Sequence, residues 1–190
     1  EEKFQELDAL GQFHMKTAAA IRGFEEAQPY RVKGYSFREG NGLYIIVGCE
    51  KLEDFKFLEN LLECLSYTGL GGKRSSGFGR FECRKMKMPS TMEKGLTERK
   101  KYAMLMSLAL PKDEELEDAL QGASYQLVKR SGFVASDTYA PQQMRKKDLY
   151  VFKAGSCFRH SFRGDLWDVS EAGMHPVYRY AKGMFLGVDA

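Results

Sequence analysis

The sequence predicts an α+β fold made of two βαββαβ units, of which the first is incomplete. Segments rich in aromatic and β-branched residues alternate with segments whose apolar residues recur at helical spacing. One of these helices runs directly into a glycine-rich loop, and the loop leads into another strand-like segment. With 190 residues and a hydrophobic content of 43%, the chain is long enough to bury one or two cores.

The first unit is predicted over residues 1–88. Residues 1–30 are polar and are expected to be irregular. Strands are expected at 31–39 and 42–50, where aromatic and β-branched residues are frequent. The sequence Gly-Asn-Gly at 40–42 predicts a hairpin between these strands, because glycine and asparagine tolerate the positive φ of tight turns.

A helix is expected at 52–67, where Phe55 and several leucines recur every three or four residues between charged residues. The glycine-rich loop follows this helix, and a strand is expected at 78–88. The order of strand, hairpin, strand, helix, loop and strand is the second half of a βαββαβ ferredoxin-like unit. We therefore expect the first strand and helix of that unit to lie upstream of Glu1 or to be missing.

Residues 89–100 are expected to form a linker, and residues 101–190 a second α+β unit of similar type. Its predicted elements are strands at 101–111, 123–136 and 147–158, an acidic helix at 112–121 that ends before Gly122, and a final strand at 183–188. In the first of these strands, Met104, Met106 and Leu108 alternate with smaller residues, as a half-buried strand requires.

Positive charge is concentrated around the glycine-rich loop. The whole chain carries a formal net charge of only +3. Between Lys73 and Lys87, six basic residues oppose Glu82 alone, which gives this stretch a net charge of +5. A concentrated basic segment that is rich in glycine points to a ligand that carries phosphate.

The loop does not fit two common nucleotide-binding motifs. A Walker A loop requires Ser or Thr after Gly72 and Lys73, where this chain has Arg74. A dinucleotide-binding fingerprint requires its third glycine at that same position. Both motifs lead from a strand into a helix, so that the helix N-terminus faces the phosphate, whereas this loop leads from a helix into a strand. These differences exclude a nucleotide-hydrolysing loop.

The backbone of a polynucleotide fits the loop better. Its glycines leave main-chain amides accessible to phosphates, because no Cβ atom obstructs the approach. The two serines after Arg74 add hydroxyl donors, and Lys73, Arg74 and Arg80 supply positive charge. Phe78 either stacks on a base or anchors the following strand in the core.

Other features argue against metal, cofactor and membrane binding. The four cysteines, Cys49, Cys64, Cys83 and Cys157, form no CxxC pair and fit no zinc spacing, so free thiols in a reducing cytoplasm are expected. With three histidines in the chain, a histidine-rich metal site is not expected. No cofactor is expected either. There is no run of eighteen apolar residues and no secretory leader, so we expect a cytoplasmic protein that does not enter a membrane.

The sequence GLGGKRSSGFGRF at 69–81 resembles the C-terminal glycine-rich loop of the repeat-associated (RAMP) proteins of CRISPR systems. The sequence at 157–188, which contains GDLWDVS and HPVYRY, is similar to the end of one RAMP subfamily. That subfamily is the subunit that caps the 5′ end of the guide RNA in type III-A interference complexes. PYRVKGYSF at 29–37 and LYIIV at 43–47 fit the same subfamily.

The resemblance implies two tandem ferredoxin-like (RRM-like) folds and no enzymatic activity. It implies that the chain binds the 5′ handle of the crRNA as single-stranded RNA. It also implies that the chain joins the large polymerase-palm subunit to the first RAMP subunit of the backbone filament, in antiviral defence. The implied RNA-binding residues of the loop are Gly69, Gly71, Gly72, Lys73, Arg74, Ser75, Ser76, Gly77, Phe78, Gly79 and Arg80. Outside the loop, Lys16 and Arg22 occupy the place of the family's basic thumb-like element, and His175 and Arg179 are further candidates within HPVYRY.

Two alternatives stay open. A RAMP endoribonuclease that processes pre-crRNA without a metal would need a general base, for which His14, His160 and His175 are the candidates. A protein-interaction module would use the acidic helix at 112–121 and Trp167, the single tryptophan. Cleavage of repeat RNA in EDTA would identify the first alternative. RNA affinity that does not change when the loop cations are replaced would identify the second.

Overall fold

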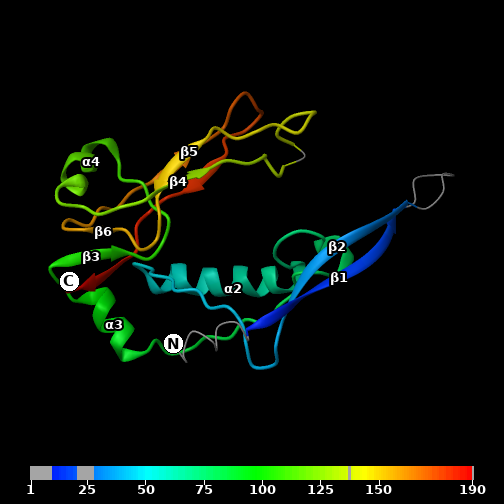
Figure 1. Ribbon diagram of the computed structural model, residues 1–190, viewed down its shortest axis with the longest axis horizontal. Helices are drawn as coiled ribbons and strands as arrows, with labels where there is room; N and C mark the ends of the chain where they lie inside the picture. The colour runs from blue at the N-terminus through cyan, green and yellow to red at the C-terminus, as the bar shows by residue number, and fades with distance from the viewer. Residues whose placement is uncertain (1–9, 21–27, 137, 190) are drawn as a thin grey trace. The chain divides into compact units, whose positions relative to one another are not determined.

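The computed structural model describes residues 10–20, 28–136 and 138–189 and divides the chain into two compact units (Figure 1). Unit 1 comprises Glu1–Arg84, and unit 2 comprises Lys85–Ala190. Both contain antiparallel strands together with helices, so the predicted α+β class is confirmed. The described strands form sheets of two or three strands, and the tandem ferredoxin-like topology stays a prediction.

Unit 1 is built on a long two-stranded hairpin (Figure 1). β1, Gly11–Ala20, pairs antiparallel with β2, Gln28–Phe37, over the full length of both strands. Because side chains alternate along a strand, one face of the hairpin is exposed and the other is largely half-buried. α2, Leu52–Thr68, confirms the helix predicted at 52–67, and the glycine-rich loop follows it.

This hairpin is not the predicted one. Irregular structure is predicted before residue 31, but β1 and the start of β2 lie there. The turn at 38–41 does form, with the Asn41 N–H donating to the Arg38 carbonyl at 3.0 Å. The segment after this turn, 42–50, forms no ladder with any described strand, and the segment at 78–88 is not a strand either. Composition identifies strand-like segments correctly only when a partner strand is available to pair with them.

The described residues of unit 1 contain no buried apolar side chain. Leu43, Tyr44 and Ile45 are 85%, 78% and 66% exposed. Phe57 and Leu61 of α2 are exposed as well, although their spacing is that of an amphipathic helix. Unit 1 therefore presents apolar surface that the described residues do not cover.

Unit 2 contains more elements, all of them short. They are α3 Ser90–Thr97, β3 Tyr102–Leu105, α4 Asp113–Leu120, β4 Leu127–Arg130, β5 Leu149–Phe152, β6 Cys157–Phe158, β7 Leu166–Asp168, β8 Tyr178–Tyr180 and β9 Phe185–Val188. β3 lies between β6 and β9 in a three-stranded antiparallel sheet. β4 pairs with β5, and β7 pairs with β8, in separate antiparallel pairs.

The core of unit 2 is largely aromatic. Phe158 is fully buried, and its ring centroid lies 5.1 Å from that of Phe152 and 5.3 Å from that of Phe162. Leu105 of β3 and Ala119 of α4 belong to the same buried cluster. Burial of these side chains supplies the hydrophobic stabilisation that orders the unit.

The elements of unit 2 agree with the sequence in part. The acidic helix predicted at 112–121 is α4, and the final strand predicted at 183–188 contains β9. The strands predicted at 101–111 and 123–136 are shorter, as β3 and β4. The segment 147–158 is divided into β5 and β6, because Gly155 turns the chain at a φ of 92°.

Two regions of unit 2 differ from the prediction. The expected linker at 89–100 contains α3, which packs on β9 where Gly95 leaves room for the Leu186 side chain. β7 and β8 form a hairpin that the sequence does not predict. The packing of α3 on β9 depends on a contact between segments far apart in the sequence, which local patterns do not report.

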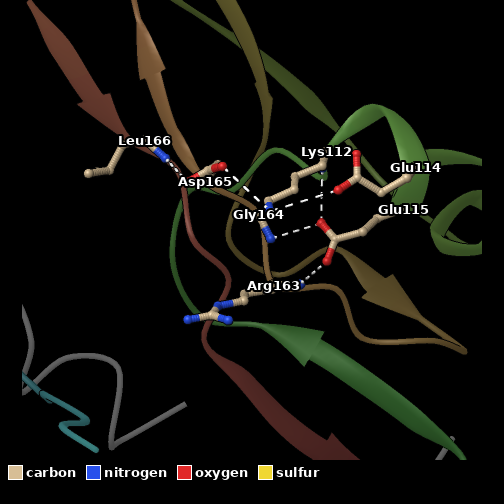
Figure 2. A network of polar contacts seen from close by, with 7 residues as sticks. All are labelled: Lys112, Glu114, Glu115, Arg163, Gly164, Asp165 and Leu166. Carbon is tan, nitrogen blue, oxygen red and sulfur yellow. Dashed lines mark hydrogen bonds and ion pairs between the residues drawn. The ribbon is translucent and has the colours of Figure 1, made fainter.

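The carboxylate of Glu115 joins the start of α4 to the segment before β7 (Figure 2). Its Oε2 accepts the N–H of Lys112 at 3.0 Å and the N–H of Gly164 at 3.0 Å, and its Oε1 accepts the N–H of Arg163 at 2.9 Å. Burial opposes ionisation of this group. The three hydrogen bonds and the charge of Lys112 outweigh that effect and lower the pKa of Glu115.

Because the pKa of Glu115 is lower in the folded chain, its contribution to stability depends on pH. An unperturbed glutamate has a pKa of about 4.3. The contribution is therefore fully present above about pH 5 and is lost as the pH falls through the folded-state pKa. We expect the difference in unfolding free energy between wild type and Glu115→Gln, measured with urea, to be largest near neutral pH and to shrink below about pH 4. A difference that stays constant down to about pH 3 would contradict this expectation.

Candidate nucleic-acid interface

The glycine-rich loop, residues 69–80, is closed at its base. The Leu70 N–H donates to the Gly79 carbonyl at 2.8 Å and ties the two ends of the loop together. Between these ends, Arg74–Ser76 form the 3-10 turn η2, and the Gly77 N–H donates to the Arg74 carbonyl at 3.0 Å. The loop therefore has a defined backbone shape.

Backbone conformation explains why glycine recurs in this loop. Four residues have φ values from 77° to 85°, a region that side chains disfavour: Gly69, Gly71, Gly77 and Gly79. A Cβ atom on Gly79 would collide with the Leu70 carbonyl, and one on Gly69 would lie 2.9 Å from the Phe78 carbonyl oxygen. The close approach at the base of the loop thus requires glycine at both positions.

The loop and the end of α2 surround a hollow of about 680 Å³, lined by Tyr67, Thr68, Gly71, Lys73, Arg74, Ser75 and Arg80. Lys73, Arg74 and Arg80 make no ion pair with a carboxylate in the part of the chain that the structure describes. Lys73 has a φ of 61°, a left-handed conformation that is uncommon outside glycine and concentrates at functional sites. Unpaired cations around an open hollow form an anion-binding surface.

The β1–β2 hairpin contacts this loop at two points. Lys73 Nζ lies 4.5 Å from the centroid of the Tyr30 ring and donates to the Tyr30 hydroxyl at 3.3 Å. Lys16 Nζ lies 5.7 Å from the centroid of the Phe78 ring. The register of the ladder puts Lys16 and Tyr30 on the same face of the hairpin. The structure thus brings the predicted Lys16 to the glycine-rich loop.

Five of the predicted loop residues line the hollow, namely Gly71, Lys73, Arg74, Ser75 and Arg80. The others form the backbone of the loop around it: Gly69, Gly72, Ser76, Gly77, Phe78 and Gly79. Sequence reasoning missed Tyr67, Thr68 and Tyr30. Tyr67 and Thr68 directly precede the loop, so their adjacency is a usable signal. Tyr30 lies 43 residues before Lys73, and no local pattern connects the two.

The remaining predicted RNA-binding residues are Arg22, His175 and Arg179. Arg22 is outside the described residues, and His175 and Arg179 belong to unit 2. His175 Nε2 lies 3.0 Å from Ser136 Oγ, and its Nδ1 lies 2.9 Å from the Pro176 carbonyl oxygen. Arg179 is half-buried in β8, and its Nε is a buried donor that lacks a described acceptor. The residues that line the hollow all come from unit 1.

The other two histidines also have polar neighbours. His14 Nδ1 lies 3.2 Å from Ser36 Oγ, and His160 Nδ1 lies 3.9 Å from Asp118 Oδ2. Over the described residues, no group of His, Cys, Asp and Glu side chains is arranged to hold a metal ion. None of the helices described above combines the length and apolarity needed to cross a bilayer.

Replacing Gly79 with alanine is expected to weaken binding of single-stranded RNA by roughly tenfold or more. The new Cβ would collide with the Leu70 carbonyl, and loss of that closure would displace the loop cations. Fluorescence anisotropy with a labelled repeat-derived RNA measures the change. Gly42→Ala is the matched control, since a Cβ there meets no atom within 4 Å. Equal affinities of the two variants would count against the closed-loop geometry.

Two comparisons with known proteins bear on the family of this chain. Residues 98–188 match the family model for the CRISPR Csm4 C-terminal domain. The chain is also 46% identical over 173 residues to the CRISPR system Cms protein Csm4 of Mycobacterium tuberculosis (strain ATCC 25618 / H37Rv). These 173 residues cover 90% of this chain and 55% of that protein. The chain is thus similar to the Csm4 proteins of CRISPR systems. The resemblance seen in the sequence is thereby confirmed.

Other Csm4 proteins show the same relation. The CRISPR system Cms protein Csm4 of Streptococcus thermophilus is 38% identical over 162 residues, which cover 84% of this chain and 52% of that protein. The corresponding protein of Methanocaldococcus jannaschii is 26% identical over 154 residues, covering 77% of this chain and 40% of that protein. The chain thus spans about half the length of the curated relatives from Mycobacterium tuberculosis and Streptococcus thermophilus.

Proposed function

We propose that this chain is a non-catalytic RNA-binding component of a type III-A CRISPR effector complex, and that its glycine-rich loop holds the 5′ handle of the crRNA. The observation that supports this most directly is the hollow lined by Lys73, Arg74 and Arg80, whose charges no described carboxylate neutralises. The phosphates of single-stranded RNA carry the negative charge that a hollow lined by cations attracts. Similarity to Csm4 proteins of CRISPR systems supplies the CRISPR context.

In this function the chain joins the large polymerase-palm subunit to the first RAMP subunit of the backbone filament. Exposed apolar surface supports a role in assembly, because such surface is typical of protein interfaces. It includes Leu43 and Ile45 in unit 1 and Tyr178 and Tyr180 in unit 2, which are 61% and 67% exposed.

The proposal is tested by the RNA that the protein carries. The chain is expressed with the other subunits of its complex, the complex is purified, and the 5′ ends of the bound RNA are sequenced. We expect a common 5′ end within the repeat sequence, and ultraviolet cross-links from that end to residues 69–80. RNA with scattered 5′ ends, or cross-links that avoid the loop, would overturn the proposal.

A metal-independent endoribonuclease is the competing function. Its candidate bases include His175, whose Nε2 lies 3.0 Å from Ser136 Oγ and whose Nδ1 lies 2.9 Å from the Pro176 carbonyl oxygen. Incubation of the chain with repeat RNA in EDTA separates the two functions. Intact RNA is expected, and a specific product that disappears in His175→Ala or His14→Ala would establish the enzyme instead.

A further inference from the structure

The exposed face of the β1–β2 hairpin carries a row of aromatic side chains. Phe13 lies opposite Tyr35 in the ladder, and Phe37 follows on the same face. The ring centroids are 4.9 Å apart for Phe13 and Tyr35 and 5.2 Å apart for Tyr35 and Phe37, both edge to face. Phe13 is 66% exposed, and Tyr35 and Phe37 are each 42% exposed. These three residues are termed the aromatic stripe.

The aromatic stripe lies on the opposite side of the hairpin from the glycine-rich loop. Lys16 and Tyr30, which contact the loop, occupy the alternate positions of the same two strands. Since consecutive side chains of a strand point to opposite faces, the stripe points away from these contacts. It is therefore a surface separate from the hollow beside η2.

The charge around the aromatic stripe is positive. Lys33 Nζ lies 4.0 Å from the centroid of the Phe13 ring, and Arg31 is the next residue of β2 on the same face. Neither β1 nor β2 contains an aspartate or a glutamate. Exposed rings beside unopposed cations are the means by which proteins hold single-stranded nucleic acid, because bases stack on the rings and phosphates pair with the cations.

Another exposed apolar segment of unit 1 has different chemistry. Residues 42–48 carry mostly aliphatic side chains and no charged residue. Such a segment suits the apolar surface of a polypeptide. Cations beside the aromatic stripe attract an anionic ligand instead, which favours a ligand that has both phosphates and flat bases.

We propose that the aromatic stripe is a stacking surface for unpaired bases of single-stranded RNA, with Lys33 and Arg31 pairing with the adjacent phosphates. The inference rests on the proposed function, since it gives the RNA held at the glycine-rich loop a second contact. The two contacts differ in kind. The loop neutralises phosphates, whereas the stripe binds the faces of bases without selecting their sequence.

Two RNA strands of equal length and charge distinguish these contacts: a repeat-derived RNA, and the same backbone with abasic sugars. Each is titrated against the full chain by fluorescence anisotropy. We expect Phe13→Leu/Tyr35→Leu to bind the base-bearing strand at least about tenfold more weakly than wild type, with an unchanged salt dependence. The abasic strand should bind both proteins equally. Tyr35→Phe keeps the ring and is the matched control, expected within about twofold of wild type.

This inference would be overturned if Phe13→Leu/Tyr35→Leu lost the same affinity for both strands, or lost no affinity for the base-bearing strand. Cross-linking of 5-iodouridine-substituted RNA to the wild-type chain tests it without any variant. Cross-linked peptides that contain Phe13 or Tyr35 are expected, and their absence would overturn it. A double variant that binds RNA normally but loses a co-purifying subunit would show that the stripe is a protein interface instead.

The proposed function is tested separately by Lys73→Ala/Arg74→Ala. This variant should bind both strands more weakly and with a weaker salt dependence. Normal binding of Lys73→Ala/Arg74→Ala, together with selective loss in the stripe variant, would contradict the role of the loop and leave the stacking surface in place.

Discussion

Replacing Lys73, Arg74 and Arg80 together with alanine is expected to weaken binding of the handle RNA about 100-fold at moderate salt. Each cation lines the same hollow, and none has a described carboxylate partner to compete with phosphate. Three contacts of about 1 kcal/mol each account for this loss. Each phosphate neutralised on a single strand also contributes roughly 0.7 to the slope of log affinity against log salt. The slope of the triple variant should therefore be less negative by about two.

The experiment needs a control that removes the same charge elsewhere. Lys94, Arg99 and Lys153 are exposed residues of unit 2, and their replacement by alanine also removes three positive charges. Anisotropy titrations over a range of salt concentrations compare the two triple variants with wild type. We expect the control to retain its affinity within a few-fold, since these three residues belong to the other unit and do not line the hollow. Equal losses in the two triple variants would mean that net charge matters, and not the hollow.

Glu115→Ala is expected to lower the free energy of unfolding of unit 2 by about 2–4 kcal/mol. The carboxylate accepts three backbone N–H groups, two of them 48 and 49 residues away in the sequence. Its removal leaves the N–H of Gly164, a buried residue, without its acceptor. It also removes the attachment of α4 to the segment before β7. Unsatisfied buried donors cost more than the net strength of the bonds that they lose.

Glu114→Ala provides the comparison for this measurement. Glu114 is the preceding residue of α4, its side chain is 73% exposed, and its Oε1 lies 3.8 Å from Lys112 Nζ. We expect this variant to change stability by less than about 0.5 kcal/mol, as exposed ion pairs contribute little. Trp167, the single tryptophan, lies in β7 and reports the unfolding of unit 2 by fluorescence in urea. Similar urea midpoints of unfolding for Glu114→Ala and Glu115→Ala would show that the hydrogen bonds of the Glu115 carboxylate do not stabilise unit 2.

Local signals were sufficient for part of this fold. Helical spacing predicts α2, and the acidic segment that ends before Gly122 predicts α4. The glycines of the loop and their neighbouring cations predict an anion-binding segment, and five of those residues line the hollow. Each of these features depends on residues within a few positions of one another, so the sequence reports it directly.

Pairing between strands could not be predicted in the same way. The segments 31–39 and 42–50 have strand composition and a turn between them, yet β2 pairs with β1. An alternating pattern predicts which side chains of a strand share a face, but it does not predict which other segment pairs with that strand. The division of 147–158 into two strands and the β7–β8 hairpin have the same cause.

Glycine content, charge and helical period are local properties, so the order of the amino acids is enough to predict the glycine-rich loop, its cations and the helix that leads into it. Only the three-dimensional path of the chain brings Tyr30 and Lys16 to the loop and places the aromatic stripe on one exposed face. It also brings Glu115 to Arg163 and Gly164. The contacts between separate segments join residues that are 22 to 62 positions apart. They form only when the register of the strands and the path of the chain bring complementary groups together.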